Sequence, residues 1–531
     1  MSQDHANSTM SKPAGQSRLG DPLVLGVSIG FILGFVALSL YDVDMVAEGI
    51  AAGFAWTAKT LGSYFQWLLL LTFLVAMGLV ASPAASARVG NLERPELSTF
   101  KWLSIIMCTL LAGGGVFFAA GEPVYHFVVT PPAFDTEPGT PEAIAGALAQ
   151  SFMHWGFLAW AVLGSLTAVV LAHAHYGRGL PLQPRTLLTP VLGESVTRGW
   201  LGSLVDALCV IAVVAGTVGP IGFLATQVSF GLHELFGLPE GYTTQLVILV
   251  ALGAVYVASA MTGIHRGIQW LSRFNVILAL VIAAVIILFG PTAFLVNAFT
   301  QGFGEYLTSF FTMATMTSQT APAWWMQWWT VFFFAWFIGY GPLMAIFVAR
   351  ISRGRTIRQM ILAVAVMAPI ATTVWFTLLG GSGIHYQLTG AIDLSEALQN
   401  FQFDVATLTV AQALPGGPVM ALAILLLTTI FVATTGDSMS YAISVVGAGH
   451  DAPDASVRAF WGIAMALMAA ILLHMGAGQI GALQQFIVIT AIPVSLVLLP
   501  SLWTGPQAAI AMAREQGIIA QASSARGTKT S

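Results

Sequence analysis

Residues 110–123 read LLAGGGVFFAAGEP, a strongly apolar run that contains three consecutive glycines. Each glycine costs a helix roughly 1 kcal/mol relative to alanine, so three in succession predict a broken helix. A second interruption, IGYGP, stands at residues 338–342, where an interior proline costs about 3 kcal/mol. Inside a lipid bilayer, backbone groups released in this way are tolerated only where protein or a polar cavity satisfies them. In a membrane, the two stretches would therefore be two opened helices that line a cavity.

The composition is that of a membrane protein. Charged residues make up 8% of the 531 residues, hydrophobic residues 57%, and the mean hydropathy is +0.82. Apolar runs of about twenty residues, long enough to cross a hydrocarbon core of roughly 30 Å, recur along the chain. We therefore expect an all-α polytopic membrane protein with 12 transmembrane helices. The expected spans lie near residues 22–41, 61–82, 100–122, 146–174, 203–232, 242–262, 268–290, 323–349, 360–380, 417–446, 458–475 and 479–503.

Lysine and arginine are distributed very unevenly over the loops between these spans. With both termini on one side of the membrane, that side receives every basic residue except Lys59. Basic loops mark the cytoplasmic side of a membrane protein. Both termini are therefore predicted to be cytoplasmic, and we expect a multi-pass protein of a bacterial inner membrane.

The two glycine-rich stretches also divide the chain. They fall in the third and eighth expected spans, so that each begins a block of five helices. Because five is odd, the second block must run inverted, and paired broken helices in inverted repeats are typical of a secondary transporter's binding site. Close helix packing is the alternative role for such glycines. The expected segments are a cytoplasmic tail at 1–20, spans 1 and 2 at 21–82, a first repeat at 100–290, an external loop with an interfacial helix at 291–322, a second repeat at 323–503 and a cytoplasmic tail at 504–531.

Aromatic residues crowd the eighth span. In the segment WWMQWWTVFFFAWF and just beyond it, Trp329, Phe333, Trp336 and Tyr340 fall at helical spacing on one face. Ring faces are natural partners of a quaternary ammonium group, which has no N–H to donate, and each desolvated ring contributes roughly 1–2 kcal/mol. The tryptophans at the start of the segment are instead expected in an interfacial aromatic belt: Trp324, Trp325 and Trp328.

The fourth span supplies two further aromatic residues, Trp155 and Trp160, in the segment HWGFLAWA at residues 154–161. Together the two spans predict an aromatic cage for an onium headgroup beside the opened backbone. Three rings would offer about 3–6 kcal/mol, against about 8 kcal/mol for micromolar affinity. The remainder is expected to come from a carboxylate of the substrate, held by main-chain N–H groups of the opened helix.

These segments resemble the betaine/choline/carnitine transporter (BCCT) family. Residues 328–359, WWTVFFFAWFIGYGPLMAIFVARISRGRTIRQ, are similar to that family's eighth-span signature and to the A-R-I-S-R-G-R loop that follows it. HWGFLAWA is similar to its fourth-span pattern H-W-G-x-H-x-W-A, GEPVYHF to the end of its third span, and TTGDS at 434–438 to the T-S-A-D-S of its tenth. The resemblance covers approximately residues 20–505. It implies a leucine-transporter-type core, a 5+5 inverted repeat preceded by two additional N-terminal spans.

The resemblance also implies a zwitterionic onium substrate in an aromatic box, a sodium ion that drives its uptake in many members, and a homotrimer. The substrate-binding positions that it implies, with Trp329 farthest out, are Trp155, Trp160, Trp336, Phe337, Tyr340, Trp329, Gly113 and Gly114. An oxygen-only set suits a hard cation such as sodium. The implied sodium ligands are the hydroxyls of Thr434 and Thr435, the carbonyl of Phe431 and carbonyls near Cys108 and Leu111.

Several positions depart from the family pattern. The box tyrosine of the fourth span is Leu163 here, and the two eighth-span tryptophans are Phe337 and Tyr340. At a second sodium site, one threonine is kept as Thr217 and the other is Val213. The reduced box favours a differently shaped headgroup, such as a sulfonium or a less methylated amine.

Ionisable residues within spans are functional candidates by default. Glu122 precedes Pro123 and is expected to cap a helix end, whereas His154 is expected to make a structural hydrogen bond. Asp437 is expected to bond a nearby break in the backbone. The complete set of such residues is Glu122, His126, His154, Asp206 and Asp437.

The sequence therefore predicts a secondary active transporter that imports a glycine betaine-like or dimethylsulfoniopropionate-like zwitterion by alternating access, coupled to sodium. Cation-independent exchange of carnitine- or betaine-type substrates is the alternative within transport. A membrane sensor or enzyme is a further alternative, although the sequence has no Walker loop, H-E-x-x-H or G-x-S-x-G element. Apart from the coupling ion no cofactor is expected, and the expected partners are the substrate, membrane lipid and further copies of the chain, with no nucleic acid.

Overall fold

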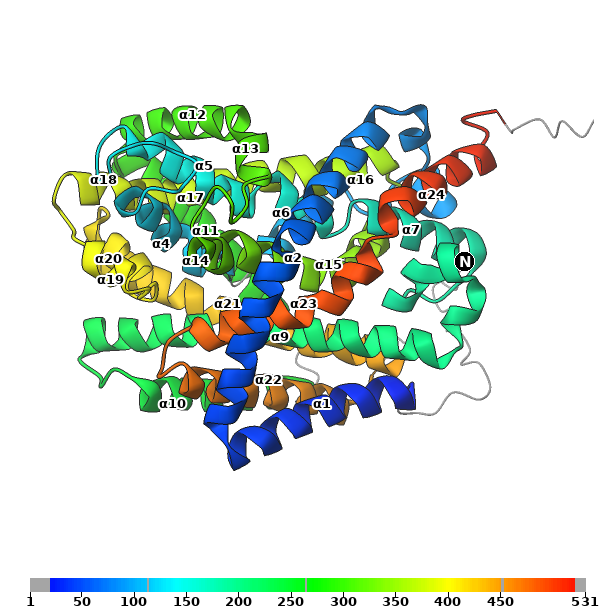
Figure 1. The fold of residues 1–531 in the computed structure, drawn as a ribbon, viewed down its shortest axis with the longest axis horizontal. Helices are drawn as coiled ribbons and strands as arrows, with labels where there is room; N and C mark the ends of the chain where they lie inside the picture. The colour runs from blue at the N-terminus through cyan, green and yellow to red at the C-terminus, as the bar shows by residue number, and fades with distance from the viewer. Residues whose placement is uncertain (1–19, 112–113, 263–264, 450–452, 521–531) are drawn as a thin grey trace, which may run out of the picture.

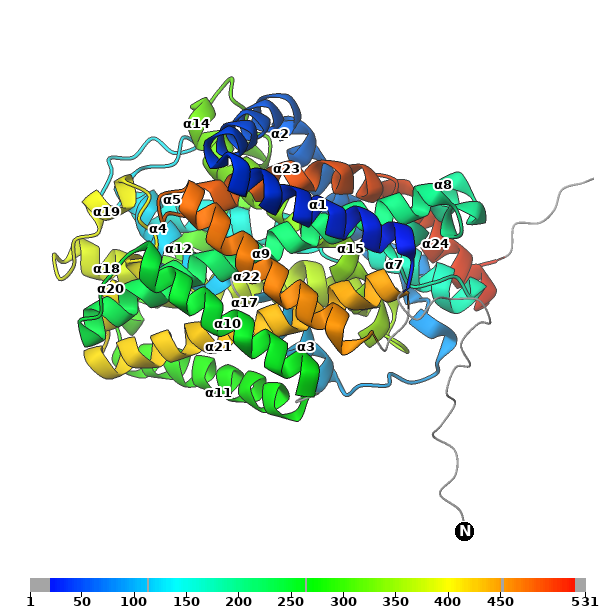
Figure 2. The ribbon, with the colours of Figure 1, turned by 90° about the horizontal axis from the view of Figure 1, so that it is seen from below.

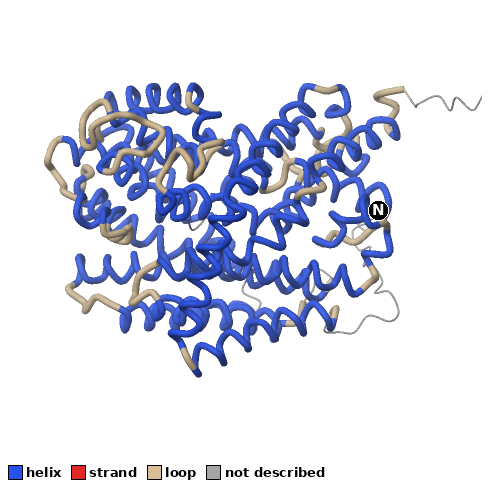
Figure 3. The backbone as a smooth tube through the Cα atoms, viewed as in Figure 1, coloured by secondary structure: helices blue, strands red, loops and turns tan. Residues whose placement is uncertain are grey.

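The computed structural model is helical throughout the part of the chain that it describes, and that part contains no strand (Figure 3). Gly113 and the outer parts of both predicted tails fall outside the described residues. The expected all-α class is confirmed. The described residues are 20–111, 114–262, 265–449 and 453–520.

Ten helices or continuous helical runs among the described residues are long and apolar enough to cross a membrane. A further pair, Arg273–Phe289 of α11 (His265–Phe289) and α12 (Thr292–Thr308), passes the same test together but is bent by 106°. The chain is therefore a polytopic membrane protein, whereas the count of twelve and the inverted repeat stay predictions. The ten are α1 (Pro22–Tyr41), α2 (Val43–Ala81), Ala143–Gly177, α9 (Trp200–Phe236), α10 (Tyr242–Thr262), Ala323–Ile351, Ile357–Leu388, α21 (Gly417–Ala448), α22 (Ala455–Met475) and α23 (Gly481–Leu498).

Shorter helices subdivide or connect these spans. The three subdivided runs contain α5 (Ala143–Trp155), α6 (Phe157–Val162), α7 (Leu166–Ala172) and η3 (His173–Gly177); α14 (Ala323–Met326), η6 (Gln327–Val331) and α15 (Phe332–Ile351); α16 (Ile357–Leu362), η7 (Ala363–Met367), α17 (Ala368–Phe376), η8 (Thr377–Gly381) and α18 (Ser382–Leu388). The separate elements are η1 (Pro83–Ser86), η2 (Val89–Asn91), α3 (Thr99–Leu111), α4 (Gly114–Val128), η4 (Pro184–Leu188), α8 (Thr189–Leu192), η5 (Glu194–Thr197), α13 (Phe310–Ala314), α19 (Ser395–Gln399), α20 (Ala406–Ala413) and α24 (Ser501–Glu515).

The third predicted span is covered by α3 and α4. α3 is described up to Leu111 and α4 from Gly114, and residues 112–113 between them lie outside the described part of the chain. The break predicted at the third-span glycines therefore stays a prediction. A helix opened there would present carbonyl oxygens and N–H groups that have no partner within the helix.

The eighth span, in contrast, is not broken at residues 338–342, and that prediction was wrong. α15 continues through Pro342 to its end at Ile351. A Cβ atom at Gly341 would lie 2.9 Å from Leu498 Cδ1 and 3.3 Å from the carbonyl oxygen of Val162. The glycine therefore lets α15 approach two neighbouring spans closely, which is the packing role that sequence alone leaves as the alternative. The irregular turn of this span lies earlier, in the π-helical η6.

The fourth span carries an interruption that the sequence reasoning missed. α5 and α6 meet at Gly156, whose φ of −99° and ψ of −141° are not helical. A side chain at this position would clash with the carbonyl oxygen of Phe152. The N–H of Phe157 donates instead to the Tyr306 hydroxyl at 3.0 Å. A second glycine, Gly164, has a φ of +151° and separates α6 from α7.

α9 is the buried centre of the bundle. On one side it packs against α1, α10 and α22, and α22 lies between the other two (Figures 1 and 2). On its other side it packs against α15, α21 and α23, and α4 contacts both α5 and α9. The residues where α4, α5, α9, α15 and α21 meet are therefore screened from lipid, and this is where a site can form.

Candidate substrate-binding site

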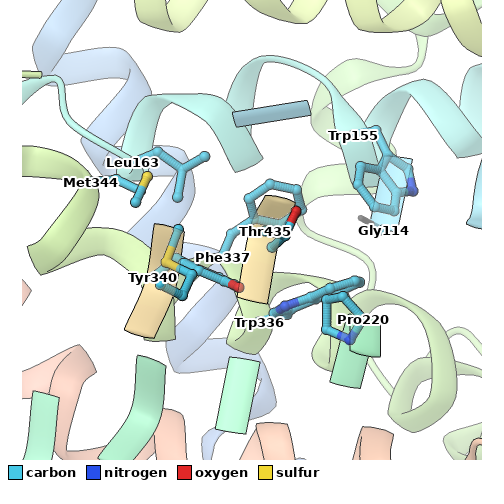
Figure 4. A pocket seen from close by; sticks show the side chains of 10 residues that line it. Gly114, Trp155, Leu163, Pro220, Trp336, Phe337, Tyr340, Met344 and Thr435 are labelled. Atoms are coloured by element: carbon cyan, nitrogen blue, oxygen red, sulfur yellow. The ribbon is translucent and has the colours of Figure 1, made fainter. Parts of the chain in front are cut away.

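A small cavity lies at the meeting point of these five helices (Figure 4). Its volume is about 50 Å³, whereas one water molecule needs roughly 10–15 Å³, so the cavity has room for a few waters. Its lining is mostly aromatic and apolar. The lining residues are Gly114 of α4, Trp155 of α5, Leu163 after α6, Pro220 of α9, Trp336, Phe337, Tyr340 and Met344 of α15, and Thr435 and Met439 of α21.

Trp155 stands nearly at right angles to two other rings of this lining. The centroids of Trp155 and Trp336 are 5.9 Å apart with an interplanar angle of 77°, and those of Trp155 and Phe337 are 5.5 Å apart at 85°. Tyr340 follows Trp336 by one helical turn on the same face of α15. Perpendicular rings turn several π-faces towards one volume, which is the arrangement that surrounds a methylated cation.

Hydrogen bonds hold the polar edges of these rings away from the cavity. The Trp155 Nε1–H donates to Glu122 Oε2 at 2.7 Å. The Trp336 Nε1–H donates to the carbonyl oxygen of Gly216 at 3.1 Å. The hydroxyl of Tyr340 bonds that of Thr217 at 3.0 Å. Because the edges are engaged elsewhere, the faces of the rings remain for a ligand.

Gly114 is the position that lets two of these rings close over the cavity. A Cβ atom there would lie 2.9 Å from Trp155 Cη2 and closer still to Trp336 Cη2. Any side chain at this position would push both indoles apart. Gly114 therefore borders the cavity without a side chain.

A larger cavity of about 690 Å³ adjoins the box on the side of Arg350 and Arg458. Met344 and Met439 line both cavities and form the partition between them. Asp437, two residues after Thr435, lies in this vestibule and pairs with Arg458 at 3.7 Å. A ligand leaving the box in this direction has only flexible methionine side chains to displace.

The opposite side of the box is closed by packed aromatic rings. Trp329 contacts Tyr125, His126 and Phe403, with centroids 4.6, 4.5 and 5.6 Å apart. Trp329 is 1% exposed. None of the residues that line the box also lines the cavity on the far side of this ring cluster.

Beyond these rings lies a second vestibule of about 510 Å³, at the opposite end of α22. It contains Glu240 and Asp404, both in loops. Burial raises the pKa of Asp404 to about 6, and the nearby charge of Glu240 also raises it. The acidic lining distinguishes this vestibule from the arginine-containing one.

The sequence matches the family of betaine/carnitine/choline transporters, BCCT, over residues 23–514. The chain belongs to the BCCT family.

It is 48% identical over 496 residues to Glycine betaine transporter 2 of Vibrio parahaemolyticus, covering 93% of this chain and 91% of that protein. It is 32% identical to Glycine betaine transporter OpuD of Bacillus subtilis, covering 82% and 85% of the two chains. Glycine betaine transporter 1 of Vibrio parahaemolyticus is also 32% identical, with 90% and 91% covered. The protein is a transporter and not an enzyme.

Not every box position implied by BCCT membership reaches the cavity. Trp155, Trp336, Phe337 and Tyr340 line it with Gly114. Trp160 is buried in α6 but is not among the lining residues, and Gly113 lies outside the described residues. Trp329 lies beyond the box, in the ring cluster described above. The lining also includes residues that sequence reasoning did not single out, because nothing in their spacing separates them from core positions: Pro220, Met344 and Met439.

The sodium positions implied by BCCT membership are partly visible. Thr435 lines the cavity, and its hydroxyl is buried without a hydrogen-bond partner, so its oxygen is free to bind a cation. The Thr434 hydroxyl donates to the carbonyl oxygen of Ile430 at 2.8 Å and lies 3.3 Å from that of Phe431. α21 is continuous through these residues. The side chains of the last residues of α3, including Cys108 and Leu111, lie outside the described part of the chain.

Two predictions for residues near the box were wrong. Glu122 does not cap a helix end; it lies within α4, fully buried, and accepts hydrogen bonds from the fourth span. Trp325 does not lie in an exposed belt, since it is 1% exposed and packs against His126 and His154. Neither position carries a local sequence signal, because its partners come from other spans.

The remaining ionisable residues within spans have defined partners. The structural hydrogen bond predicted for His154 is confirmed: its Nδ1 lies 2.7 Å from Glu122 Oε1. Asp206 accepts from the main-chain N–H and Nε of Arg185, at 2.7 and 2.6 Å. Asp437 pairs with Arg458.

Proposed function

We propose that this BCCT protein imports glycine betaine or a closely related onium zwitterion, such as a dimethylsulfoniopropionate-like sulfonium, as a secondary active transporter. The observation that carries the proposal is the set of perpendicular rings whose polar edges are engaged elsewhere. In such a box a methylated cation contacts ring faces on several sides. A neutral polar solute gains little from these rings, because it has no positive charge to interact with them. The names of its relatives, three of which are glycine betaine transporters, agree with this substrate class.

The start of α4 supplies the second half of the recognition. A helix N-terminus carries unpaired N–H groups and the positive end of the helix dipole, which favour a carboxylate. Gly114, the first described residue of α4, lines the cavity, and a helix opened at the third-span glycines would place its N-terminus here. A zwitterion can therefore place its onium group among the rings and its carboxylate at the start of α4. A substrate without the carboxylate loses the second interaction.

The two sides of the box support transport by alternating access. On the side of Arg350 only Met344 and Met439 separate the box from a wide vestibule, whereas a packed ring cluster closes the other side. With the basic side cytoplasmic, this is an inward-facing arrangement. Import then requires a second arrangement in which the ring cluster around Trp329 separates and the methionine side closes.

Sodium coupling is part of the proposal, with Thr435 as its central ligand. The Thr435 hydroxyl is an unpaired oxygen inside the cavity, and a third span opened at its glycines would add carbonyl oxygens without helical partners. Hydroxyl and carbonyl oxygens are the ligands that a hard monovalent cation accepts. We further propose that the protein lies in a bacterial inner membrane with both termini in the cytoplasm. We also propose that its spans form a 5+5 inverted repeat and that it assembles as a homotrimer, as the family resemblance implies.

Uptake into liposomes tests the function. The purified protein, reconstituted with an inward sodium gradient, is expected to accumulate labelled glycine betaine, and unlabelled betaine and dimethylsulfoniopropionate to compete better than taurine. Replacing sodium with potassium is expected to abolish accumulation. If accumulation stops but betaine-for-betaine exchange persists unchanged without sodium, the coupling is wrong and the exchanger alternative holds. If no methylated zwitterion competes, the substrate class is wrong.

A further inference from the structure

A buried cluster of three titratable side chains lies directly behind the aromatic box. Its members are Glu122 and His126, one turn apart on α4, and His154 on α5. All three are fully buried, and one polar atom of each lies within 4.8 Å of those of the other two. The cluster is not used by the binding mode described above, yet it touches the box through Trp155.

The carboxylate of Glu122 joins the cluster to the box. Its Oε2 accepts the indole N–H of Trp155, and its Oε1 lies 2.7 Å from Nδ1 of His154, the adjacent residue on α5. The other ring nitrogen of His154 lies 3.0 Å from the side-chain amide of Gln150 and 3.3 Å from the Thr330 hydroxyl. Both oxygens of the carboxylate therefore bond neighbouring residues of α5. Only the indole ring of Trp155 separates the carboxylate charge from the position proposed for the headgroup.

His126 is the unpaired member of the cluster. Its Nε2 lies 3.6 Å from Glu122 Oε1, beyond hydrogen-bond distance, and neither of its ring nitrogens has a hydrogen-bond partner. An unpaired polar group inside an apolar region is costly, as is an uncompensated carboxylate. A proton on His126 compensates the carboxylate charge, because it turns the contact with Glu122 into an ion pair.

No other charge on the packed elements compensates Glu122. Among the described residues its ion-pair partners are the two histidines alone. The rings that surround the cluster are uncharged: Tyr125, Trp325, Trp329 and Phe333. On other elements packed against α4 and near it, His385 contacts the ring of Phe294, Glu396 and Lys101 are exposed, and Asp206 bonds Arg185.

We propose that Glu122, His126 and His154 form a proton-binding site whose charge sets the affinity of the adjacent box for an onium headgroup. Without the proton, the carboxylate is uncompensated and attracts a cation in the box through Trp155. With the proton on His126, the cluster is neutral and that attraction is lost. The proton and the onium group therefore weaken each other's binding, and by linkage the effect is reciprocal. Binding of the onium transfers the His126 proton to water.

The inference rests on the proposed betaine binding and gives opposite results for two variants. In wild-type protein, betaine affinity measured by tryptophan fluorescence is expected to rise roughly tenfold from acidic to alkaline pH. Glu122→Gln keeps an acceptor for Trp155 but removes the charge, so affinity should stay low at every pH. His126→Gln cannot take up the proton, so affinity should stay high at every pH. A merely structural role would lower affinity in both variants.

His385→Gln is the matched control, since His385 contacts an aromatic ring of another helix and lies outside the cluster. It is expected to keep the wild-type pH profile. Should either cluster variant fail to fold, proton release from the wild-type protein decides: adding betaine at mildly acidic pH in weak buffer should acidify the solution. Betaine binding with a flat pH profile and no proton release overturns the inference. An absence of betaine binding at every pH overturns the proposed function instead.

Discussion

Trp329 and Trp336 lie seven residues apart on the same span, and both are almost completely buried, yet they differ at the indole N–H. Trp329 has rings packed around it, and its indole N–H has no partner. Trp336 stacks on the ring of Phe332, with centroids 5.4 Å apart, but its N–H is also fixed to the carbonyl oxygen of Gly216 and its ring lines the cavity. One ring is held by its neighbours alone, and the other by its neighbours and by a hydrogen bond at its edge.

The difference separates a packing ring from a binding ring. A ring that must stay in place with a face uncovered needs a hydrogen bond at its edge, because contacts on the open side cannot hold it. A ring that closes a passage needs only neighbours on its faces. Burial and residue type are the same in both cases, so neither property distinguishes the two roles; the partner of the indole N–H does.

The largest expected effect is on stability, from Trp329→Ala. Removing a buried tryptophan whose faces are covered leaves a cavity and costs about 3–5 kcal/mol. Thermal unfolding in detergent should show the loss. Trp336→Ala, measured alongside, should cost clearly less, because its ring already borders an empty volume. Equal losses of stability from the two substitutions would contradict the distinction between a packing ring and a binding ring.

Gly114→Ala is expected to have the next largest effect, on affinity. The added methyl would lie 2.9 Å from Trp155 Cη2 and closer still to Trp336, so the two rings must move apart. Overpacking of this kind costs about 1–3 kcal/mol, and here it falls on the binding geometry. Betaine titration by fluorescence measures it.

Gly339→Ala is the matched control for Gly114→Ala, because its added Cβ would find its nearest neighbour at 3.7 Å, the carbonyl oxygen of Ala212. It should leave betaine affinity unchanged. An equal loss of betaine affinity in both variants would mean that any methyl group added near the box disturbs binding. The close contact of Gly114 with the two indole rings would then not explain the effect.

Trp336→Ala should weaken onium binding by about 1–2 kcal/mol, the contribution of one desolvated ring. Trp336→Phe, which keeps a ring face, should recover part of the loss. Trp160→Ala provides the comparison, since Trp160 is buried in α6 outside the cavity lining. Competition between labelled betaine and unlabelled substrates in liposomes gives the affinities. A larger loss from Trp160→Ala than from Trp336→Ala would place the headgroup elsewhere.

Sequence reasoning reached those parts of the site that depend on residue type and helical spacing. Trp336, Phe337 and Tyr340 share one helix, so their common face follows from their positions. The third-span glycines predict an interrupted helix from local energetics, at residues that lie partly outside the described chain. The eighth-span glycines share this composition but stand in a continuous helix, where Leu498 and Val162 of other spans pack closely against Gly341.

The unpredicted features all depend on partners distant in sequence. The interruption at Gly156 is stabilised by the hydroxyl of Tyr306, about 150 positions away, which accepts the N–H of Phe157. Glu122 reads as a capping residue next to Pro123, and only the approach of α5 gives its carboxylate two donors. Local pattern fixes neither contact.

The smallest effect is expected from Tyr340→Phe. This variant tests whether Tyr340, like Trp336, needs a hydrogen bond at its polar edge to stay in place beside the cavity. The substitution keeps the ring face but removes its bond to the Thr217 hydroxyl, so betaine affinity should fall by about 0.5–1.5 kcal/mol. Thr217→Val removes the same bond from the other side, and the double variant should lose little more than either single one. Additive losses in this cycle would show that the two hydroxyls act separately, and that packing alone positions Tyr340. A ring that is held by packing alone would then also line the box. In that case a hydrogen bond to the polar group of a ring would no longer distinguish binding rings from packing rings.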